Sequence, residues 1–345
     1  MPKLYNKKYS KSELIKHIGR LHQIAGVEEI ALSGGRRAGN RALQFRTGSG
    51  FDFRVLPDRG MDISLASFKG ASLCWMSSCG ESAPQFYESQ GTGWLRSFYG
   101  GLLTTCGLCN VGVPCEDEGE SFGLHGRISN LPAEEVAFGH EWEKDECYLY
   151  GEGKIRETSV FGPNLLLHRW ITSKVGESWI RIEDKIENQG FKTEPLLFLY
   201  HCNFGFPLMD KDTKLIAPSK KVFKRENLEE ADGKNYSQFT SPVSGKEEEV
   251  FYHDMEPDEN GFVTVKIIND SFNKGSGLGV YLRYNAKTLP RFIQWKMSGE
   301  GTYVLGLEPS NTWVGGRSAE KERNNIKHIK PGQAIKYELE IGILE

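Results

Sequence analysis

From Val27 to the end of the chain, short runs of alternating apolar and polar residues are separated by glycine-rich turns. In 178–188, for example, Ile180 and Ile182 alternate with charged and aromatic residues, as a half-buried strand requires. Similar runs occupy 42–48, 51–56, 61–68, 72–77, 147–153, 154–161, 165–175, 194–204, 262–269, 277–285, 291–297, 302–309 and 334–344. About fourteen strands at hairpin spacing predict an all-β fold, a large antiparallel β-sandwich, and argue against alternating βα units.

One helix is predicted, before the first strand. Ser10 and Glu13 have the spacing of a capping box, and Gly26 is a suitable stop. The apolar stripe of this helix is Leu14, Ile15, Ile18 and Leu21. Because the stripe is narrow, we expect residues 1–26 to form a helical appendage and residues 27–345 to form a single β-sandwich domain.

The composition limits the classes of partner. The net charge of the 345-residue chain is −3, which gives no basic field for nucleic acid or an anionic membrane. Seven cysteines, an odd number, indicate reduced thiols rather than a disulfide framework. The first residues lack the apolar segment of a secretory signal, and no apolar run approaches the roughly 20 residues that cross a bilayer. We therefore expect a cytoplasmic protein, and because exposed strand edges often pair, a homodimer is a further expectation.

The sequence FGLHGRISN, residues 122–130, contains the first candidate for chemistry. Gly123 and Gly126 allow a sharp turn or a close approach of the backbone around His125. An imidazole can transfer protons near neutral pH, and Arg127 adds a forked donor that suits carboxylates, phosphates or vicinal hydroxyls. The alternative is a turn histidine with a structural hydrogen bond.

Two further candidates come at the ends of apolar strands. His201 follows the run LLFLY, and Asn203 begins the loop chemistry beyond it. Glu308 follows VLGL and precedes a proline that forces the chain out of the strand. Partial burial lowers the pKa of a histidine and raises that of a glutamate, which makes both usable in proton transfer. The alternatives are a core-edge histidine bonded to a carbonyl and a glutamate paired with an arginine.

Other polar residues could bind a ligand. Arg59, in the turn LPDRGMDI, is expected to project at a strand end, unless Asp58 and Arg59 or Asp62 form a local ion pair. Gln294 and Lys296 share one face of a strand, with Trp295 on the other.

A zinc site is a further alternative. Cys106 and Cys109 have C-x-x-C spacing, and Cys115 and His125 could complete a Cys₃His set. The same glycine-rich run also suits a packed strand with buried thiols.

Two longer segments break the rhythm of strands. The aromatic and polar stretch 80–99, with Trp94, Arg96 and Tyr99, could form a lip over a cleft. The stretch 224–261 is rich in Lys, Glu, Asp and Asn, which predicts a long polar excursion at the surface.

Taken in order, five motifs resemble the aldose 1-epimerase (galactose mutarotase) superfamily, and most closely a divergent branch of it. They are LPDRGMDI, GGLLTTCGL, FGLHGRISN, LYHCNFG and GLEPSNTW. The resemblance implies a galactose mutarotase-like supersandwich with a sugar cleft on one concave sheet. It also implies interconversion of the α and β anomers of a sugar, with no cofactor and no metal.

The resemblance implies roles for individual residues. Glu308 would be the base that takes the proton of the anomeric hydroxyl, and His201 the acid that protonates the ring oxygen from the opposite side. His125 would hold sugar oxygens, and Arg59 would match a substrate-binding arginine. The remaining predicted substrate-binding residues are Arg127, Asn203, Gln294 and Lys296.

The chain also departs from the superfamily. Phe122 and Arg127 stand where an asparagine and a glycine are usual, and Asp210 is only a loose match for the aspartate that contacts sugar hydroxyls. Arg127 and Lys296 would favour an acidic or phosphorylated sugar. Two other functions remain open: a non-catalytic carbohydrate-binding or sensing protein on the same fold, and a zinc-dependent isomerase or hydrolase using the cysteines.

Overall fold

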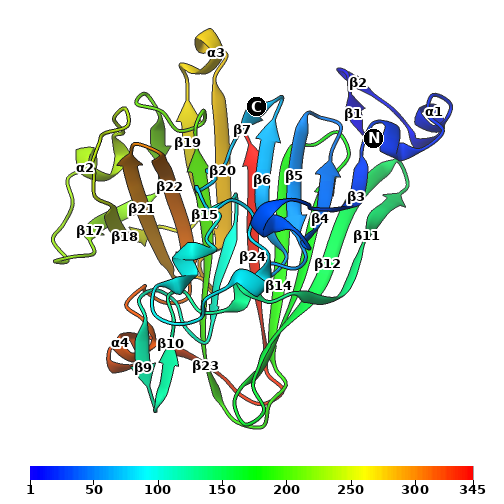
Figure 1. The fold of residues 1–345 in the computed structure, drawn as a ribbon. Coiled ribbons are helices and arrows are strands. Elements are labelled where there is room, and N and C mark those ends of the chain that lie inside the picture. The colour runs from blue at the N-terminus through cyan, green and yellow to red at the C-terminus, as the bar shows by residue number, and fades with distance from the viewer. Residues whose placement is uncertain (345) are drawn as a thin grey trace.

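The computed structural model describes residues 1–344, which form an antiparallel β-sandwich (Figure 1). One layer is an eight-stranded sheet with the strand order β11-β12-β13-β14-β24-β20-β19-β16. Its strands are β11 (Ala133–Glu143), β12 (Glu146–Thr158), β13 (Asn164–Lys174), β14 (Trp179–Asn188), β24 (Ala334–Ile343), β20 (Leu278–Asn285), β19 (Phe262–Asn269) and β16 (Lys214–Ile216). The predicted all-β sandwich is confirmed.

The opposite layer consists of two sheets. The seven-stranded sheet contains β17 (Ser219–Lys224), β18 (Glu249–Met255), β21 (Arg291–Gly299), β22 (Thr302–Ser310), β15 (Glu194–Gly205), β23 (Lys327–Ile329) and β8 (Thr104–Leu108). The five-stranded sheet contains β3 (Gly26–Ala31), β4 (Arg41–Arg46), β5 (Phe51–Leu56), β6 (Asp62–Phe68) and β7 (Ala71–Ser72). Isolated bridges, Ile63 to Leu103 and Cys74 to Phe204, join the two sheets.

Short elements complete the chain at the edges of the layers. They are β1 (Lys3–Leu4), β2 (Lys7–Lys8), β9 (Cys115–Asp117), β10 (Glu120–Phe122), α1 (Lys11–Ile15), α2 (Gly233–Ser237), α3 (Phe272–Gly275) and α4 (Arg317–Glu322). Among residues 1–344, no helix has the length and apolar character that crossing a membrane would require.

Strand β15 is buried on both of its faces. Phe198, Tyr200 and the next alternate residues join the main hydrophobic core between the layers. Leu197 and Leu199 belong to a second, smaller cluster on the other side of the sheet. A strand packed on both faces reads as a continuous apolar run, which accounts for LLFLY. Because side chains alternate, His201 projects toward the smaller cluster and away from the main core.

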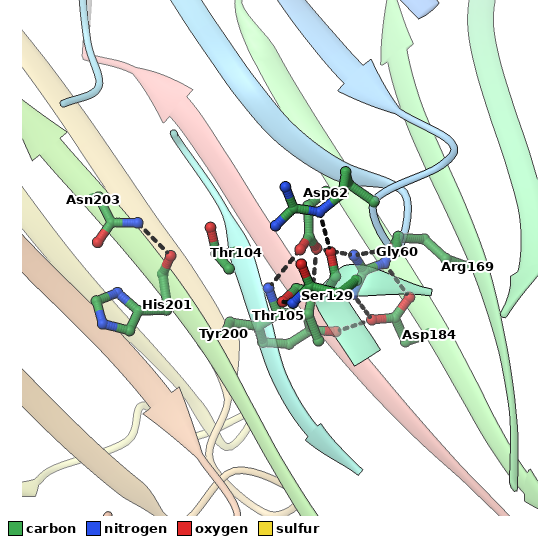
Figure 2. Close-up of polar contacts among 12 residues, drawn as sticks. Gly60, Asp62, Thr104, Thr105, Ser129, Arg169, Asp184, Tyr200, His201 and Asn203 are labelled. Atoms are coloured by element: carbon green, nitrogen blue, oxygen red, sulfur yellow. Dashed lines mark hydrogen bonds and ion pairs between the residues drawn. The ribbon is translucent and has the colours of Figure 1, made fainter. Parts of the chain in front are cut away.

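A buried polar network crosses the main core beneath β15 (Figure 2). Arg169 donates to both carboxylate oxygens of Asp184, at 2.9 and 2.7 Å, and to Asp62 Oδ1 at 2.8 Å. The hydroxyl of Tyr200 donates to Asp184 at 2.8 Å, and Thr105 donates to Asp62 through its backbone N–H and its hydroxyl. Burial raises the pKa of Asp62 to about 6, while the Arg169 charge opposes the rise. The network ties β6, β8, β13, β14 and β15 together and fixes β15 beside His201.

The N-terminal prediction is only partly right. The capping box of Ser10 and Glu13 is present, but the helix ends at Ile15, and Gly26 begins strand β3 instead of stopping a helix. The segment folds back against the sandwich near β11 and β12, as Figure 1 shows at the upper right. Leu4, Leu14 and Leu21, which come from β1, α1 and the short helical turn 21–23, are buried in the main core.

Other strand predictions also need correction. The run 72–77 overlaps the two-residue strand β7 only at Ser72. The runs 147–153 and 154–161 form one long strand, β12, because the intervening glycines stay in the ladder with β13. The stretch 224–261 is not only a surface excursion, since it contains β18, which pairs with β21 along residues 249–253. The buried part of that strand, VFYH, was outweighed by the charged residues around it.

Candidate functional site

A cavity of about 230 Å³ opens on the side of the seven-stranded sheet that faces away from the main core. Its lining residues come from β15, β18, β21, β22 and the loops around residues 94–98, 112–113, 124–125, 225 and 314. They include Trp94, Phe98, His125, His201, Arg225, Glu248, Trp295 and Glu308. The cavity lies just below the roughly 300–1,000 Å³ of typical ligand pockets. It therefore suits one small ring and leaves little room for anything larger.

His201 and Glu308 meet at the base of this cavity. The register of β15 and β22 pairs Cys202 with Leu307, which places the two residues directly opposite each other on neighbouring strands. Nε2 of His201 lies 3.3 Å from Oε1 of Glu308. The residues are 5% and 2% exposed. The predicted proton-transfer residues, more than a hundred positions apart in sequence, are thus neighbours in one opening.

The contact corrects the expectation that acid and base flank a sugar ring from opposite sides, because no ring fits between atoms 3.3 Å apart. Anomerisation does not require such a separation. The anomeric hydroxyl and the ring oxygen are bonded to the same carbon, so one adjacent pair of groups can reach both oxygens.

Gly306 makes room for the carboxylate. It precedes Glu308 by two residues and therefore lies on the same face of β22. A Cβ at this position would lie 2.8 Å from Oε1 of Glu308 and 3.0 Å from Cβ of Trp295. The absence of a side chain lets the Glu308 carboxylate fold back over its own strand, beside the indole of Trp295.

Burial shifts the pKa values of the pair in opposite directions. It raises the pKa of Glu308 from 4.5 to about 8, with a smaller rise from the Glu248 charge and a fall from Arg225. It lowers the pKa of His201 to about 3, and nearby His125 adds to the fall. Near neutral pH the pair therefore holds one proton, on Glu308, and both side chains are uncharged. Groups whose environments drive their pKa values apart are the typical components of acid–base sites.

His125 stands on a constrained turn beside the pair. Its own φ of +57° is uncommon for a residue with a side chain, and Gly126 follows with φ +74°. A Cβ on Gly126 would lie 2.2 Å from the carbonyl oxygen of Gly107, so only glycine fits. The N–H of Gly112 donates to Nδ1 of His125 at 3.3 Å. The neutral ring then carries its proton on Nε2, which leaves a donor for a ligand.

Aromatic side chains form the walls of the cavity. The ring of Trp94 lies 4.8 Å from that of His125, and the rings of Phe98 and Trp295 lie 5.3 and 5.5 Å from that of His201. Trp94 belongs to the stretch predicted as a lip, and this part of the prediction agrees with the structure. Arg96 and Tyr99, by contrast, do not line the cavity. Such walls suit the C–H face of a sugar and limit water around the histidines.

A charged pair lines another part of the cavity. Glu248 accepts hydrogen bonds from Nε1 of Trp295 at 2.9 Å and from Arg225 at 3.2 Å, and Arg225 also donates to Glu226 at 3.3 Å. Neither Arg225 nor Glu248 was predicted, because both lie in the polar stretch that was read as a solvated excursion. The only sequence signal was their proximity to the apolar run of β18.

Several predicted binding residues lie elsewhere. Arg59 is 1% exposed and donates to the carbonyl oxygens of Ser82, Ser97 and Ser129, because the loops around residues 82–97 and 129 close over it. It is a structural clamp and does not line the cavity. The local ion pair considered for this turn is absent too, since Asp58 binds Arg41.

Gln294 and Lys296 do share a strand face, but it is the face away from the cavity. Gln294 bonds to His253 and to the carbonyl of Tyr236, and Lys296 donates to the carbonyl of Asn235. Trp295, on the opposite face of β21, is the residue that reaches the cavity. The predicted alternation along β21 is therefore correct, but the ligand cavity lies on the face of Trp295 and not on the face of Gln294 and Lys296.

The remaining predicted residues do not line the cavity. Arg127 precedes the short helical turn 128–130, and Asp210 caps a turn at its own loop. Asn203 lies on the same face of β15 as His201, and its side-chain nitrogen donates to the carbonyl of His201 (Figure 2). Nδ1 of His201 and Oδ1 of Asn203 are buried, and within residues 1–344 neither has a hydrogen-bond partner. Asn203 is therefore a positioning residue behind His201.

The cysteines do not assemble into the suggested zinc site. Cys106 packs in the smaller cluster and Cys109 in the main core, on opposite sides of the sheet. Burial raises the pKa of both thiols well above the usual value, which disfavours the thiolate that binds zinc. Over residues 1–344, no group of three or more His, Cys, Asp or Glu side chains is arranged to hold a metal ion.

Solved structures share this fold at low sequence identity. A provisionally assigned aldose 1-epimerase from Klebsiella pneumoniae superposes with a TM-score of 0.83 at 22% identity, over 92% of this chain and 83% of that one. A galactose mutarotase-like protein from Clostridium acetobutylicum gives 0.62 at 14% identity, over 92% and 98%. Galactose 1-epimerase from Lactobacillus acidophilus gives 0.56 at 12% identity, over 92% and 98%. These likenesses confirm the fold that the five motifs implied.

No curated protein matches the sequence. One family model does, and it covers residues 37–343, from just before β4 of the five-stranded sheet to the end of β24. The chain thus belongs to the family described as Domain of unknown function (DUF4432), with the fold of galactose mutarotase-like proteins.

Proposed function

We propose that this protein is a mutarotase, an isomerase that interconverts the α and β anomers of an aldose by acid–base catalysis. The observation that carries the proposal is the contact between Nε2 of His201 and Oε1 of Glu308 at the base of an aromatic-walled cavity. Ring opening removes a proton from the anomeric hydroxyl and adds one to the ring oxygen. A pair that holds one proton, with one donor and one acceptor side by side, performs both transfers.

The resting protonation defines the first step. Glu308 is the protonated member and His201 the free base, so Glu308 can protonate the ring oxygen while His201 accepts the hydroxyl proton. The roles that the resemblance implied, Glu308 as base and His201 as acid, follow from one proton transfer across the 3.3 Å contact. After ring opening the aldehyde rotates, and the reverse transfers close the ring as either anomer. Each positioned proton transfer contributes roughly 10²–10⁴ in rate.

The proposed substrate is an uncharged aldose. Arg127 and Lys296, the basis for an acidic or phosphorylated sugar, do not line the cavity. Arg225 is the only lysine or arginine among the described lining residues, and Glu226 and Glu248 already neutralise it. A phosphate placed there would also face the Glu248 carboxylate, which would repel it.

The test is an NMR exchange measurement on a panel of aldoses that includes neutral hexoses, pentoses, sugar acids and phosphates. Saturation of one anomeric proton resonance reports the exchange rate with the other anomer. We expect the wild-type protein to accelerate exchange of at least one neutral aldose, and to favour neutral over phosphorylated sugars. Sugars that bind without faster exchange would identify the protein as a non-catalytic binder instead.

A further inference from the structure

A second hollow of about 620 Å³ lies beside the candidate active site. The two spaces share Val113, Arg225 and Val314 in their walls, so these side chains form the boundary between them. Arg225 is a long side chain that is about one third exposed. The larger space therefore adjoins the smaller one across these three side chains.

The second hollow has an aromatic floor. The rings of Tyr252 and Trp313 stack with centroids 4.2 Å apart and an interplanar angle of 23°. On the rim, Leu228 is 63% exposed and Val113 is 46% exposed, although both line the hollow. Leu228 also adopts φ +57°, a conformation that is strained for a leucine. Exposed apolar side chains gathered around a concave space indicate a binding surface.

Polar groups surround this apolar floor. Asn227, Glu226 and Arg323 line the same hollow and supply amide, carboxylate and guanidinium groups. A pyranose ring has the matching chemistry: C–H groups on its face pack on aromatic rings, and hydroxyls on its edge bond to polar side chains.

We propose that the second hollow is a subsite for a second sugar ring, and that the substrate is a reducing disaccharide; this rests on the proposed mutarotase function. The reacting ring needs a free anomeric carbon at His201 and Glu308, so the second ring must be linked through another oxygen. The cavity at the catalytic pair holds one ring, and the adjoining hollow is the space into which a linked ring extends. Contact with Trp313 would distinguish a disaccharide from its component monosaccharide.

The experiment compares glucose with cellobiose and maltose, and galactose with lactose, by titration calorimetry and by anomer exchange in the same samples. An aromatic contact contributes up to about tenfold in affinity. We expect at least one disaccharide to bind about tenfold more tightly than its monosaccharide. Trp313→Ala should remove that advantage and leave monosaccharide binding unchanged, while Trp313→Phe should retain most of it. Trp170→Ala, on the eight-stranded sheet, is the matched control and should behave as wild type.

Equal binding of monosaccharide and disaccharide in the wild type would overturn the subsite. So would an equal loss for both sugars in Trp313→Ala, or an absence of disaccharide binding. The two proposals fail separately. If no sugar is anomerised faster, the catalytic proposal fails, whereas a disaccharide preference that depends on Trp313 still supports the subsite.

Discussion

Replacing Glu308 with glutamine should change how the stability of the protein depends on pH, whatever the substrate is. Burial raises the pKa of Glu308 from 4.5 to about 8 in the folded protein. Between these values the folded state keeps a proton that the unfolded chain releases. The free energy of unfolding of the wild type must therefore fall as pH rises through this window. Glutamine has a similar shape and does not ionise, so the variant lacks this contribution.

The magnitude follows from about 1.36 kcal/mol for each pKa unit. Relative to the wild type, Glu308→Gln should gain almost nothing below pH 4.5, about 3 kcal/mol by pH 7 and about 4 kcal/mol by pH 8. A constant offset from the altered contact with His201 does not affect this trend. The assay is urea unfolding of both proteins at intervals from pH 4.5 to 8.5, followed by fluorescence and circular dichroism.

The matched control is Glu300→Gln, at an exposed turn between β21 and β22. Its unfolding free energy should track that of the wild type at every pH. A difference between Glu308→Gln and wild type that stays flat, or that shrinks toward high pH, would refute a protonated carboxyl at the base of the cavity.

Three further predictions concern the site and its support. Gly306→Ala places a Cβ within 3.0 Å of both Glu308 and Trp295. Anomerisation should therefore slow by at least about tenfold, and the free energy of unfolding should fall by about 1–3 kcal/mol. An unchanged rate in the NMR exchange assay would argue against this packing. Arg169→Met leaves the carboxylates of Asp62 and Asp184 buried without their partner. The free energy of unfolding, measured in urea, should fall by about 3–5 kcal/mol. A loss below about 1 kcal/mol would show that the network is dispensable. The pair loses its single proton as pH rises through the pKa of Glu308. The anomerisation rate should therefore be level from about pH 5 to 7 and fall about tenfold per pH unit above about pH 8. A rate that keeps rising beyond pH 9 would contradict the assignment of the proton to Glu308.

Alternation and turn chemistry predicted most of the long strands, since each needs only local information. The runs 51–56 and 262–269 coincide with β5 and β19. The same reasoning located His201 and Glu308, because a polar residue after an apolar run is a local signal. The predicted strand ends were wrong, since β15 continues to Gly205 and β22 to Ser310. What the sequence did not supply was their register. The pairing of Cys202 with Leu307 depends on how two distant strands align, and it alone brings the pair together.

The errors arose where burial on both faces removed the contrast between inside and outside. On β21, Gln294 and Trp295 point to opposite faces, and both faces are covered by other elements. Alternation then separates two faces without showing which one meets the ligand. The prediction for Arg59 failed for a related reason, because loops distant in sequence close over its turn and accept a hydrogen bond from each of its three guanidinium nitrogens.

The central claim is that His201 and Glu308 act as one proton-sharing unit on a sugar. The most direct test compares the anomer exchange rate of the best aldose for wild type, His201→Asn, Glu308→Gln and the variant carrying both substitutions. Groups that act as a unit are strongly non-additive, so the double variant should be no slower than the worse single variant, and each single variant should lose at least about a hundredfold. Losses that multiply in the double variant, or a single variant with wild-type activity, would contradict the account.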